Sequence, residues 1–298
     1  MNPIPASHRR ATRDTLLASV AAIRDTLAEQ CEAEEQQATL STTTVEALHS
    51  AGIFGMKLPA VLGGSEADPV TQFEVIDAIA AINASAGWCT MVGATSLGLL
   101  GAFLPDAGIA RMFVGGRIPR GAIVVMPGGE ARLDAGGYRL NGHWAFASGV
   151  RHAEWIVVCA RVIRDESAAP EIFLMVLPAS EVTIQDNWQV AGLKGTGSCD
   201  ITITDRVVPE CMAWNMLSAP PQRGGALYRL RPARVRCQRA RGLRTRRSAA
   251  LARYLSRERN CEEARIRAGR AESSHAFNRT THDRTQRDAS TCRACARH

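Results

Sequence analysis

The stretch of sequence best suited to chemistry is NGHWAFASGVRHAEWIVV, residues 141–158. It combines aromatic side chains, a small hydroxyl and two glycines just before a run of apolar, β-branched residues. A flat redox ring needs such surroundings: an apolar face to lie on, and a hydroxyl or backbone N–H at its reacting edge. The same residues also suit a structural role, with Trp144, Phe146 and Trp155 packing in a sheet and Ser148 forming a turn. Both interpretations stay open on the residues alone.

Other chemical motifs in the sequence are weaker. GLKGTGS, residues 192–198, has the composition of a phosphate-binding loop, but it precedes a predicted strand, so no helix dipole would face an anion. A turn between two strands is the better interpretation. Cys292 and Cys295 form a CxxC pair near His282 and His298, but a zinc site needs a second pair at a defined spacing. The sequence has no GxSxG, HExxH, Walker A or strand–GxGxxG–helix motif. We therefore predict no metal site.

The elements that must position residues 141–158 change type near residue 120. Before it, the apolar stripe from Leu16 to Cys31 predicts one helix, and Asp68 followed by Pro69 predicts the start of another. After it, short segments rich in β-branched and aromatic residues alternate with Gly, Pro and Asn turns. They predict antiparallel strands, with a hairpin turn at Gly136–Gly137.

Helices followed by strands, without alternation, predict the α+β fold class with segregated layers. We expect an N-terminal all-helical domain over residues 1–118 and an antiparallel β domain over residues 119–215. Residues 216–230 would begin a further domain. Residues 231–298 have no consistent apolar period and are predicted to be an Arg-rich tail that is disordered or out of frame.

One segment raises the possibility of a membrane span. Residues 78–105 carry no formal charge over a length that could cross a bilayer. The segment contains Asn83 and several hydroxyls, is predicted to be split by a turn at Ser85–Gly87, and lacks basic flanks. Two packed, buried helices are therefore the better interpretation. The absence of an apolar run at the start and nine irregularly spaced cysteines favour a cytoplasmic protein with reduced thiols and no membrane partner.

The formal net charge of +7 conceals two segments of opposite sign. Residues 231–298 hold 19 arginines against 6 acidic residues, whereas residues 1–230 hold 17 basic and 23 acidic residues. The body of the chain therefore gives no reason to expect a nucleic acid partner. A nucleic-acid-binding arm remains an alternative for the tail, and it predicts salt-dependent binding that is lost on truncation at Leu230.

The order of these segments resembles the acyl-CoA dehydrogenase superfamily of flavoproteins over residues 12–230. LHSAGIFGMKLPAVLGGSEADPVTQFEVIDAIAAINASAGW is similar to that family's N-terminal helical domain, and FASGVRHAEW to its flavin-contacting strand. GLKGTGSCDITITDRVVPE resembles the segment that leaves the β domain. MPGGEARLD stands where true dehydrogenases carry Thr-Glu-Pro…Gly-Ser-Asp. SAGW, FASG and GLKGTGS together resemble more closely the oxygenase components of two-component flavin monooxygenases.

The resemblance implies a cofactor, FAD or FMN in its reduced form, and roles for four residues. Phe146 takes the place of the aromatic beside the flavin, and Ser148 that of the Thr or Ser bonded to its reactive edge. Val125 and Met126 would lie near its pyrimidine side. The implied reaction is hydroxylation of a small organic, aromatic substrate with O2, and the implied partners are a flavin reductase and, as in family homotetramers, further copies of the chain.

The resemblance stops at about residue 230, where the family's C-terminal four-helix domain is not recognisable. That domain supplies the catalytic base, so no catalytic residue is assigned. We expect the tail to be an out-of-frame reading of a GC-rich gene, and translation of the other frames should then restore an amphipathic helical sequence. Two other functions stay open: an acyl-CoA dehydrogenase acting on the α,β bond of an acyl thioester, and an inactive remnant or basic-tailed binding protein.

Overall fold

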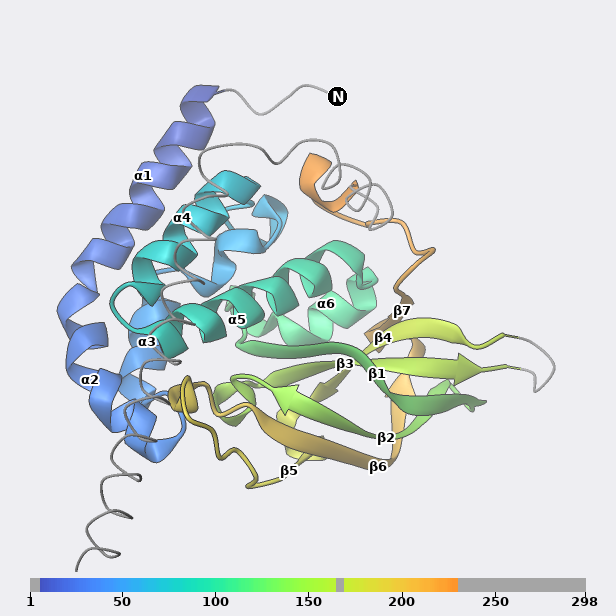
Figure 1. The fold of residues 1–298 in the computed structure, drawn as a ribbon. Coiled ribbons are helices and arrows are strands. Elements are labelled where there is room, and N and C mark those ends of the chain that lie inside the picture. Colours follow the sequence, from blue (N-terminus) through green and yellow to red (C-terminus); the bar gives the residue numbers. More distant parts are fainter. Residues whose placement is uncertain (1–5, 165–168, 230–298) are drawn as a thin grey trace, which may run out of the picture. The chain divides into compact units, whose positions relative to one another are not determined.

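The computed structural model describes residues 6–164 and 169–229. They belong to one compact unit, Met1–Pro232, which contains both a layer of helices and a sheet (Figure 1). The predictions made for residues 231–298, including the tail and the CxxC pair at Cys292 and Cys295, lie outside the described residues.

The helical layer follows the sequence pattern with one difference near its start. The stripe from Leu16 to Cys31 was predicted to be one helix, but the chain forms two, which meet at Ile23 with φ −103° and ψ 6°. The predicted cap at Asp68 is confirmed, since its carboxylate accepts the N–H of Val70 at 3.0 Å. The α-helices are α1 (Ala6–Ala22), α2 (Arg24–Gln37), α3 (Thr42–Ser50), α4 (Pro69–Ala80), α5 (Ala84–Phe103) and α6 (Asp106–Met112).

The division of the uncharged segment was predicted at the wrong place. Ser85–Gly87 lie in the first turn of α5, and the break comes earlier, at Asn83, whose side-chain oxygen accepts the N–H of Ala86 at 3.0 Å. Helix α5 is the one described helix with the length and apolarity of a membrane span. Other described residues bury 67% of its most apolar window, as expected of a core helix.

The strands form one seven-stranded sheet in the order β5-β6-β2-β1-β3-β4-β7. The α+β class is confirmed, but the sheet is mixed, because β1 pairs parallel with β3. A short connection after β2 carries the chain past β1, so β3 pairs on the other side of β1 and runs in the same direction. The strands are β1 (Gly121–Asp134), β2 (Gly137–Ala147), β3 (Trp155–Ile163), β4 (Glu171–Pro178), β5 (Thr183–Ile184), β6 (Cys199–Pro209) and β7 (Ala213–Asn215).

The predicted hairpin joins β1 to β2, one residue earlier than expected. Asp134 pairs with Gly137, which leaves Ala135 and Gly136 as the two-residue turn. Gly136 has φ 79°, a left-handed conformation that favours glycine.

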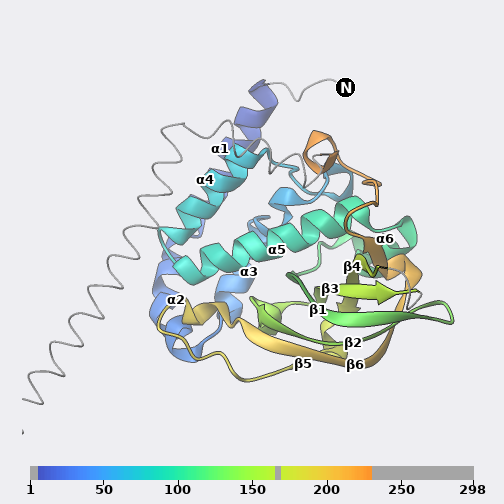
Figure 2. The same ribbon diagram turned by 45° about the vertical axis from the view of Figure 1, so that its right-hand side comes forward.

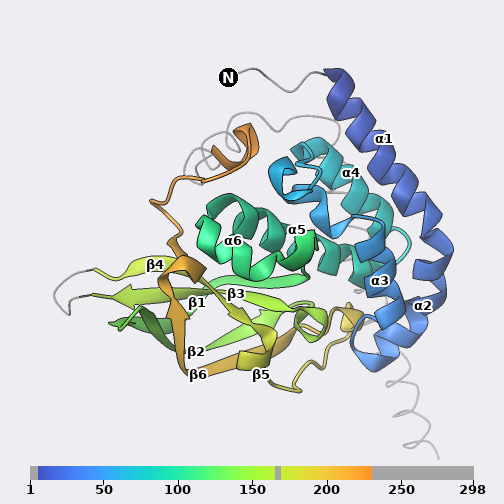
Figure 3. The ribbon, with the colours of Figure 1, turned by 180° about the vertical axis from the view of Figure 1, so that it is seen from behind.

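Helices α5 and α6 lie over the sheet, and α1 to α4 lie farther from it (Figures 2 and 3). Small residues let α5 approach the start of β1 closely. The Ser96 hydroxyl donates to the carbonyl of Ala122 at 3.3 Å, and a Cβ on Gly121 would lie only 2.5 Å from Ser96 Oγ. This contact fixes β1 just before Val125, where the predicted site begins.

Candidate functional site

Two neighbouring strands bulge at the residues predicted to face the ring. On β1 the register with β3 breaks between Val124 and Pro127, which leaves Val125 and Met126 unpaired with β3. On β2 the register with β6 breaks between Trp144 and Ala147, at the position of Phe146. Bulges redirect side chains and are frequent beside functional sites. Both bulges expose apolar side chains: Met126 is 72% and Phe146 68% exposed.

The register of the β1–β2 pair relates the two bulges. Gly129 is opposite Gly142, the last pair of the β1–β2 ladder, and the bulged residues lie beyond it, Val125 and Met126 on β1 and Phe146 on β2. A Cβ on Gly128 would lie 2.3 Å from the carbonyl oxygen of His143, so the strands stay close beside the bulges. The structure thus places three of the predicted residues, Val125, Met126 and Phe146, on adjoining strands.

Phe146 is held in an unusual backbone conformation. Its φ of 62° is left-handed, which costs a non-glycine residue about 1–2 kcal/mol. Asp200 on β6 stabilises this conformation by accepting the Phe146 N–H at 3.2 Å. The exposed ring meets that of Trp188 edge to face, with centroids 6.1 Å apart. A strained backbone that holds an apolar ring toward solvent is typical of a binding site.

Ser148, the fourth predicted residue, is buried at the base of the same segment and belongs to a chain of hydroxyls. Its Oγ accepts the indole N–H of Trp88 at 2.9 Å and lies 2.7 Å from Ser198 Oγ. Ser198 Oγ lies 2.7 Å from Thr196 Oγ1, which donates to the carbonyl of Leu193 at 2.8 Å.

The direction of every bond in this chain follows from one fixed end. A carbonyl oxygen can only accept a hydrogen bond, so the Thr196 hydroxyl must be the donor in its bond to the carbonyl of Leu193. Thr196 must then accept from Ser198, which has one proton, and Ser198 must accept from Ser148. Ser148 therefore donates its hydroxyl hydrogen to Ser198 Oγ and uses one lone pair to accept the indole N–H of Trp88. What remains at Ser148 Oγ is a single acceptor lone pair.

The loop of residues 192–198 is anchored by a carboxylate. Glu35 on α2 accepts the N–H of Lys194 and that of Gly195, each at 3.0 Å, and it also accepts the hydroxyl of Ser85 on α5. These N–H groups are therefore engaged by Glu35, and the loop is not a phosphate cradle. The loop links β5 to β6, as expected, and its last four residues are buried.

His152 follows the site closely along the chain, in the short helix η4 (Val150–His152). Its ring lies 6.5 Å from that of Phe54, and its Nδ1 is buried with no hydrogen-bond partner among the described residues. Burial, with a smaller contribution from Arg120, lowers the pKa of His152 to about 4. The imidazole is therefore neutral near pH 7.

Two residues that the sequence did not single out complete the site: Trp88 and Ser198. Both lie in motifs that the resemblance had marked, SAGW and GLKGTGS, but nothing in the sequence pairs positions 60 and 50 residues from Ser148. Among the described residues, no group of three or more His, Cys, Asp or Glu side chains could hold a metal ion. The five described cysteines are all free thiols.

Comparison with known proteins follows the same division of the chain. Residues 8–105 match the model of the acyl-CoA dehydrogenase N-terminal domain. The pigment production hydroxylase of a Rhodococcus species is 32% identical over 200 residues, which are 67% of this chain and 51% of that protein. The flavin-dependent monooxygenase oxygenase subunit HsaA of Mycobacterium tuberculosis is also 32% identical, over 66% of this chain and 49% of that protein. The chain is homologous to oxygenase components of flavin-dependent monooxygenases.

Solved structures agree with this assignment of homologues. XiaF from a Streptomyces species, solved with FADH2 and glycerol, superposes with a TM-score of 0.66 at 26% identity, covering 70% of this chain and 52% of that one. The described residues thus have an acyl-CoA dehydrogenase-like fold, and the predicted resemblance is confirmed. The chain spans about half the length of the curated relatives it matches.

Proposed function

We propose that this chain carries the flavin-binding part of an oxygenase component that hydroxylates a small aromatic compound with reduced flavin and O2. A separate flavin reductase would supply the reduced FAD or FMN. The names of the relatives, which include a flavin-dependent oxygenase subunit and a structure with FADH2, support this class of reaction. The geometry of the candidate site supports the reduced form of the cofactor in particular.

The acceptor lone pair left at Ser148 Oγ carries the proposal. A reduced flavin bears a hydrogen on N5, whereas N5 of an oxidised flavin is an acceptor. Because Ser148 donates to Ser198, its oxygen offers the ring a lone pair and no proton. This hydroxyl is matched to reduced flavin and mismatched to oxidised flavin.

The surrounding residues fit a flat ring as well. Val125, Met126 and Phe146 present exposed apolar surface on adjoining strands, and the buried Ser148 lies beyond Phe146 on the same strand end. We assign the three apolar residues to the ring face and Ser148 to its N5 edge. When bound, reduced flavin supplies the activation of O2. The residues of this chain hold the ring and exclude water from one of its faces, and Ser148 Oγ accepts a hydrogen bond from the N5–H group.

Equilibrium titration of the full chain with reduced and oxidised FMN and FAD, under anaerobic conditions, tests the proposal. We expect reduced flavin to bind about tenfold tighter, since one hydrogen bond made or mismatched contributes about 1 kcal/mol or more. In Ser198→Ala the Ser148 hydroxyl hydrogen is free to turn toward N5. The ratio of affinities for reduced and oxidised flavin should therefore fall by about fivefold. Thr183→Ala, on the exposed edge strand β5, is the matched hydroxyl control and should keep the wild-type preference.

Two outcomes would refute the assignment. One is equal affinity of the wild-type chain for the two redox states. The other is a preference that survives Ser198→Ala, because the direction of the hydroxyl chain would then have no effect on the ring.

A further inference from the structure

A cavity of about 440 Å³ lies between α5 and the segment that follows β7. Thr95, Leu99 and Phe103 line it from α5, Lys57 from the short helix η1 (Phe54–Lys57), and Trp214 from β7. Its volume falls within the range of small-molecule sites, about 300–1,000 Å³. Val125, Met126, Phe146 and Ser148 do not line it.

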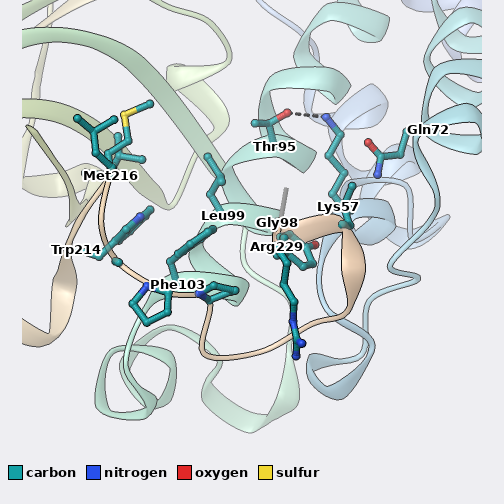
Figure 4. Close-up of a pocket in the computed structure, with 16 residues that line it drawn as sticks. Lys57, Gln72, Thr95, Gly98, Leu99, Phe103, Trp214, Met216 and Arg229 are labelled. Carbon is teal, nitrogen blue, oxygen red and sulfur yellow. Dashed lines mark hydrogen bonds between the residues drawn. The ribbon is translucent and has the colours of Figure 1, made fainter. Parts of the chain in front are cut away.

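Most of the cavity lining is apolar and includes a pair of aromatic rings. Phe103 and Trp214 stack with centroids 6.2 Å apart and planes 8° from parallel. Figure 4 shows the two rings together at one end of the cavity, with Leu99 between them and the polar end. Such a lining suits a flat or alicyclic hydrocarbon skeleton.

Lys57 provides the polar end. Its ammonium donates a hydrogen bond to Thr95 Oγ1 at 2.7 Å (Figure 4). The Thr95 hydroxyl in turn donates a hydrogen bond to the carbonyl of Met91 at 2.6 Å. No acidic side chain of the described residues forms an ion pair with Lys57, and burial lowers the pKa of the ammonium. A partly buried cation with donors left over and no counter-charge is costly unless a ligand supplies an anion.

Tyr228 also lines this cavity, and its buried hydroxyl is a second polar group that the described residues leave unpaired. Burial, and then the nearby charge of Glu66, raises the pKa of this phenol, which therefore keeps its proton. Glu66 itself accepts the backbone N–H groups of Gly225 and Ala60.

We propose that this cavity is a binding site for a small aromatic or alicyclic carboxylate. Its carboxylate pairs with Lys57, and its ring lies against Leu99, Phe103 and Trp214. A bare inorganic anion would leave the apolar lining unfilled, and a neutral hydrocarbon would leave Lys57 without a counter-charge. The site does not require flavin, so its test is independent of the proposed function.

Calorimetric titration of the full chain, without flavin, uses 2-naphthoate and its neutral isostere 2-naphthamide as probes. We expect the acid to bind wild type about tenfold tighter than the amide. Lys57→Met keeps the aliphatic stem, so it should weaken the acid about tenfold and leave the amide within about twofold. Lys57→Arg keeps the charge and should retain most of the preference. Equal affinities for the two probes in wild type, or no binding of either, would overturn the proposal.

A measurement on the unmodified wild type guards against a Lys57 variant that fails to fold. The 298-residue sequence contains only two lysines, Lys57 and Lys194, and Lys194 is exposed. Saturating 2-naphthoate should slow acylation of Lys57 at least about fivefold, as measured by peptide mass spectrometry. Lys194 should react at an unchanged rate and serves as the internal reference. Unaltered labelling of Lys57 would show that the carboxylate does not bind there.

Discussion

At the scale of single residues, His152 couples the stability of the site to pH. Its pKa is lowered from 6.5 to about 4 in the folded chain, chiefly by burial and then by Arg120. Between these two values the unfolded chain binds more protons than the folded chain, so stability is fully present above pH 6.5 and is lost as the pH falls toward 4. The neutral imidazole next to the Ser148 segment is thus a condition of the native fold.

Replacing His152 by glutamine should therefore flatten the acid limb of the stability curve. From pH 7 to pH 4.5 we expect wild type to lose about 2–3 kcal/mol more of its free energy of unfolding than His152→Gln, measured by urea denaturation. His143, which lies 3.3 Å from Asp200, is unchanged in both proteins, so its contribution cancels in the difference. Parallel curves for the two proteins would rule out a His152 contribution.

Phe146 illustrates a conflict between backbone conformation and binding. Asparagine tolerates φ near 60° better than phenylalanine, and the exposed ring contributes little to folding. We expect Phe146→Asn to keep or raise the free energy of unfolding, by up to about 1 kcal/mol, while weakening reduced flavin about tenfold. Thermal denaturation and anaerobic titration of the same samples measure the two effects. A variant that loses stability without losing flavin affinity would assign Phe146 to the fold alone.

The sequence could place Phe146 and Ser148 in one segment because both lie within a few residues of each other. It could not predict that Trp88 and Ser198 contact Ser148, because these residues are 60 and 50 positions away from Ser148 in the sequence. Nor could it reveal the left-handed backbone at Phe146, since no glycine marks that position and the conformation depends on Asp200 from another strand. The placement of Phe146 and Ser148 in one segment was predictable, and the long-range hydrogen bonds to Ser148 were not.

At the scale of elements, the start of α5 shows why a local turn signal failed. Ser, Ala and Gly in sequence suggest a turn, yet they form the first turn of a helix that packs on the end of α4. Gly87 is required there for lack of space, because a Cβ would lie 2.6 Å from the Cβ of Ala80 and 2.8 Å from its Cα. The small residues reflect close packing between two helices, which composition alone does not separate from a turn.

The substitution Gly87→Ala tests whether the small residues at the start of α5 reflect close packing against α4. In an open helix the change would stabilise by up to about 1 kcal/mol. Here the contact with the Ala80 backbone should outweigh that gain, and we expect the free energy of unfolding to fall by about 1–3 kcal/mol. Gly192→Ala is the control, because nothing lies within 4 Å of its added Cβ, and it should change stability by less than about 0.5 kcal/mol. A stabilising Gly87→Ala would contradict the close packing of α4 and α5.

The mixed sheet is the second difference at this scale. Each strand segment had the β-branched pattern from which strands are predicted, but pairing direction depends on which side of β1 the chain passes after β2. The short helix η4 makes that choice in a few residues. Sequence periodicity contains no information on it, so the α+β class was predictable and the parallel β1–β3 pair was not.

At the scale of the whole molecule, the described residues and the Arg-rich segment need separate accounts. Homology covers about two thirds of this chain but only half of each relative. The abrupt change of charge after residue 230 remains a sequence observation, and the out-of-frame hypothesis remains a prediction, since residues 230–298 lie outside the described part. The residues assigned to the flavin ring and to the hydroxyl chain lie between residues 88 and 200, all within the described part.

Within the described part, one carboxylate connects the helical layer to the edge of the sheet. Glu35 on α2 accepts two N–H groups of the loop before β6 and the hydroxyl of Ser85 on α5. The same loop carries Thr196 and Ser198, which set the direction of the hydroxyl chain at Ser148. Hydrogen bonds to a charged group contribute about 1.5–3 kcal/mol each, so this contact is large enough to position the loop.

Glu35→Gln should therefore affect stability and cofactor preference together. The amide keeps the shape but loses the charge and turns a donor toward donors, so we expect a loss of about 2–3 kcal/mol in the free energy of unfolding. The preference for reduced over oxidised flavin should also narrow by about threefold, because the loop no longer fixes Ser198. Glu32→Gln, an exposed change on the same helix, should alter neither quantity. If Glu35→Gln lowered stability but left the redox preference intact, the link between helical layer and site would be structural only.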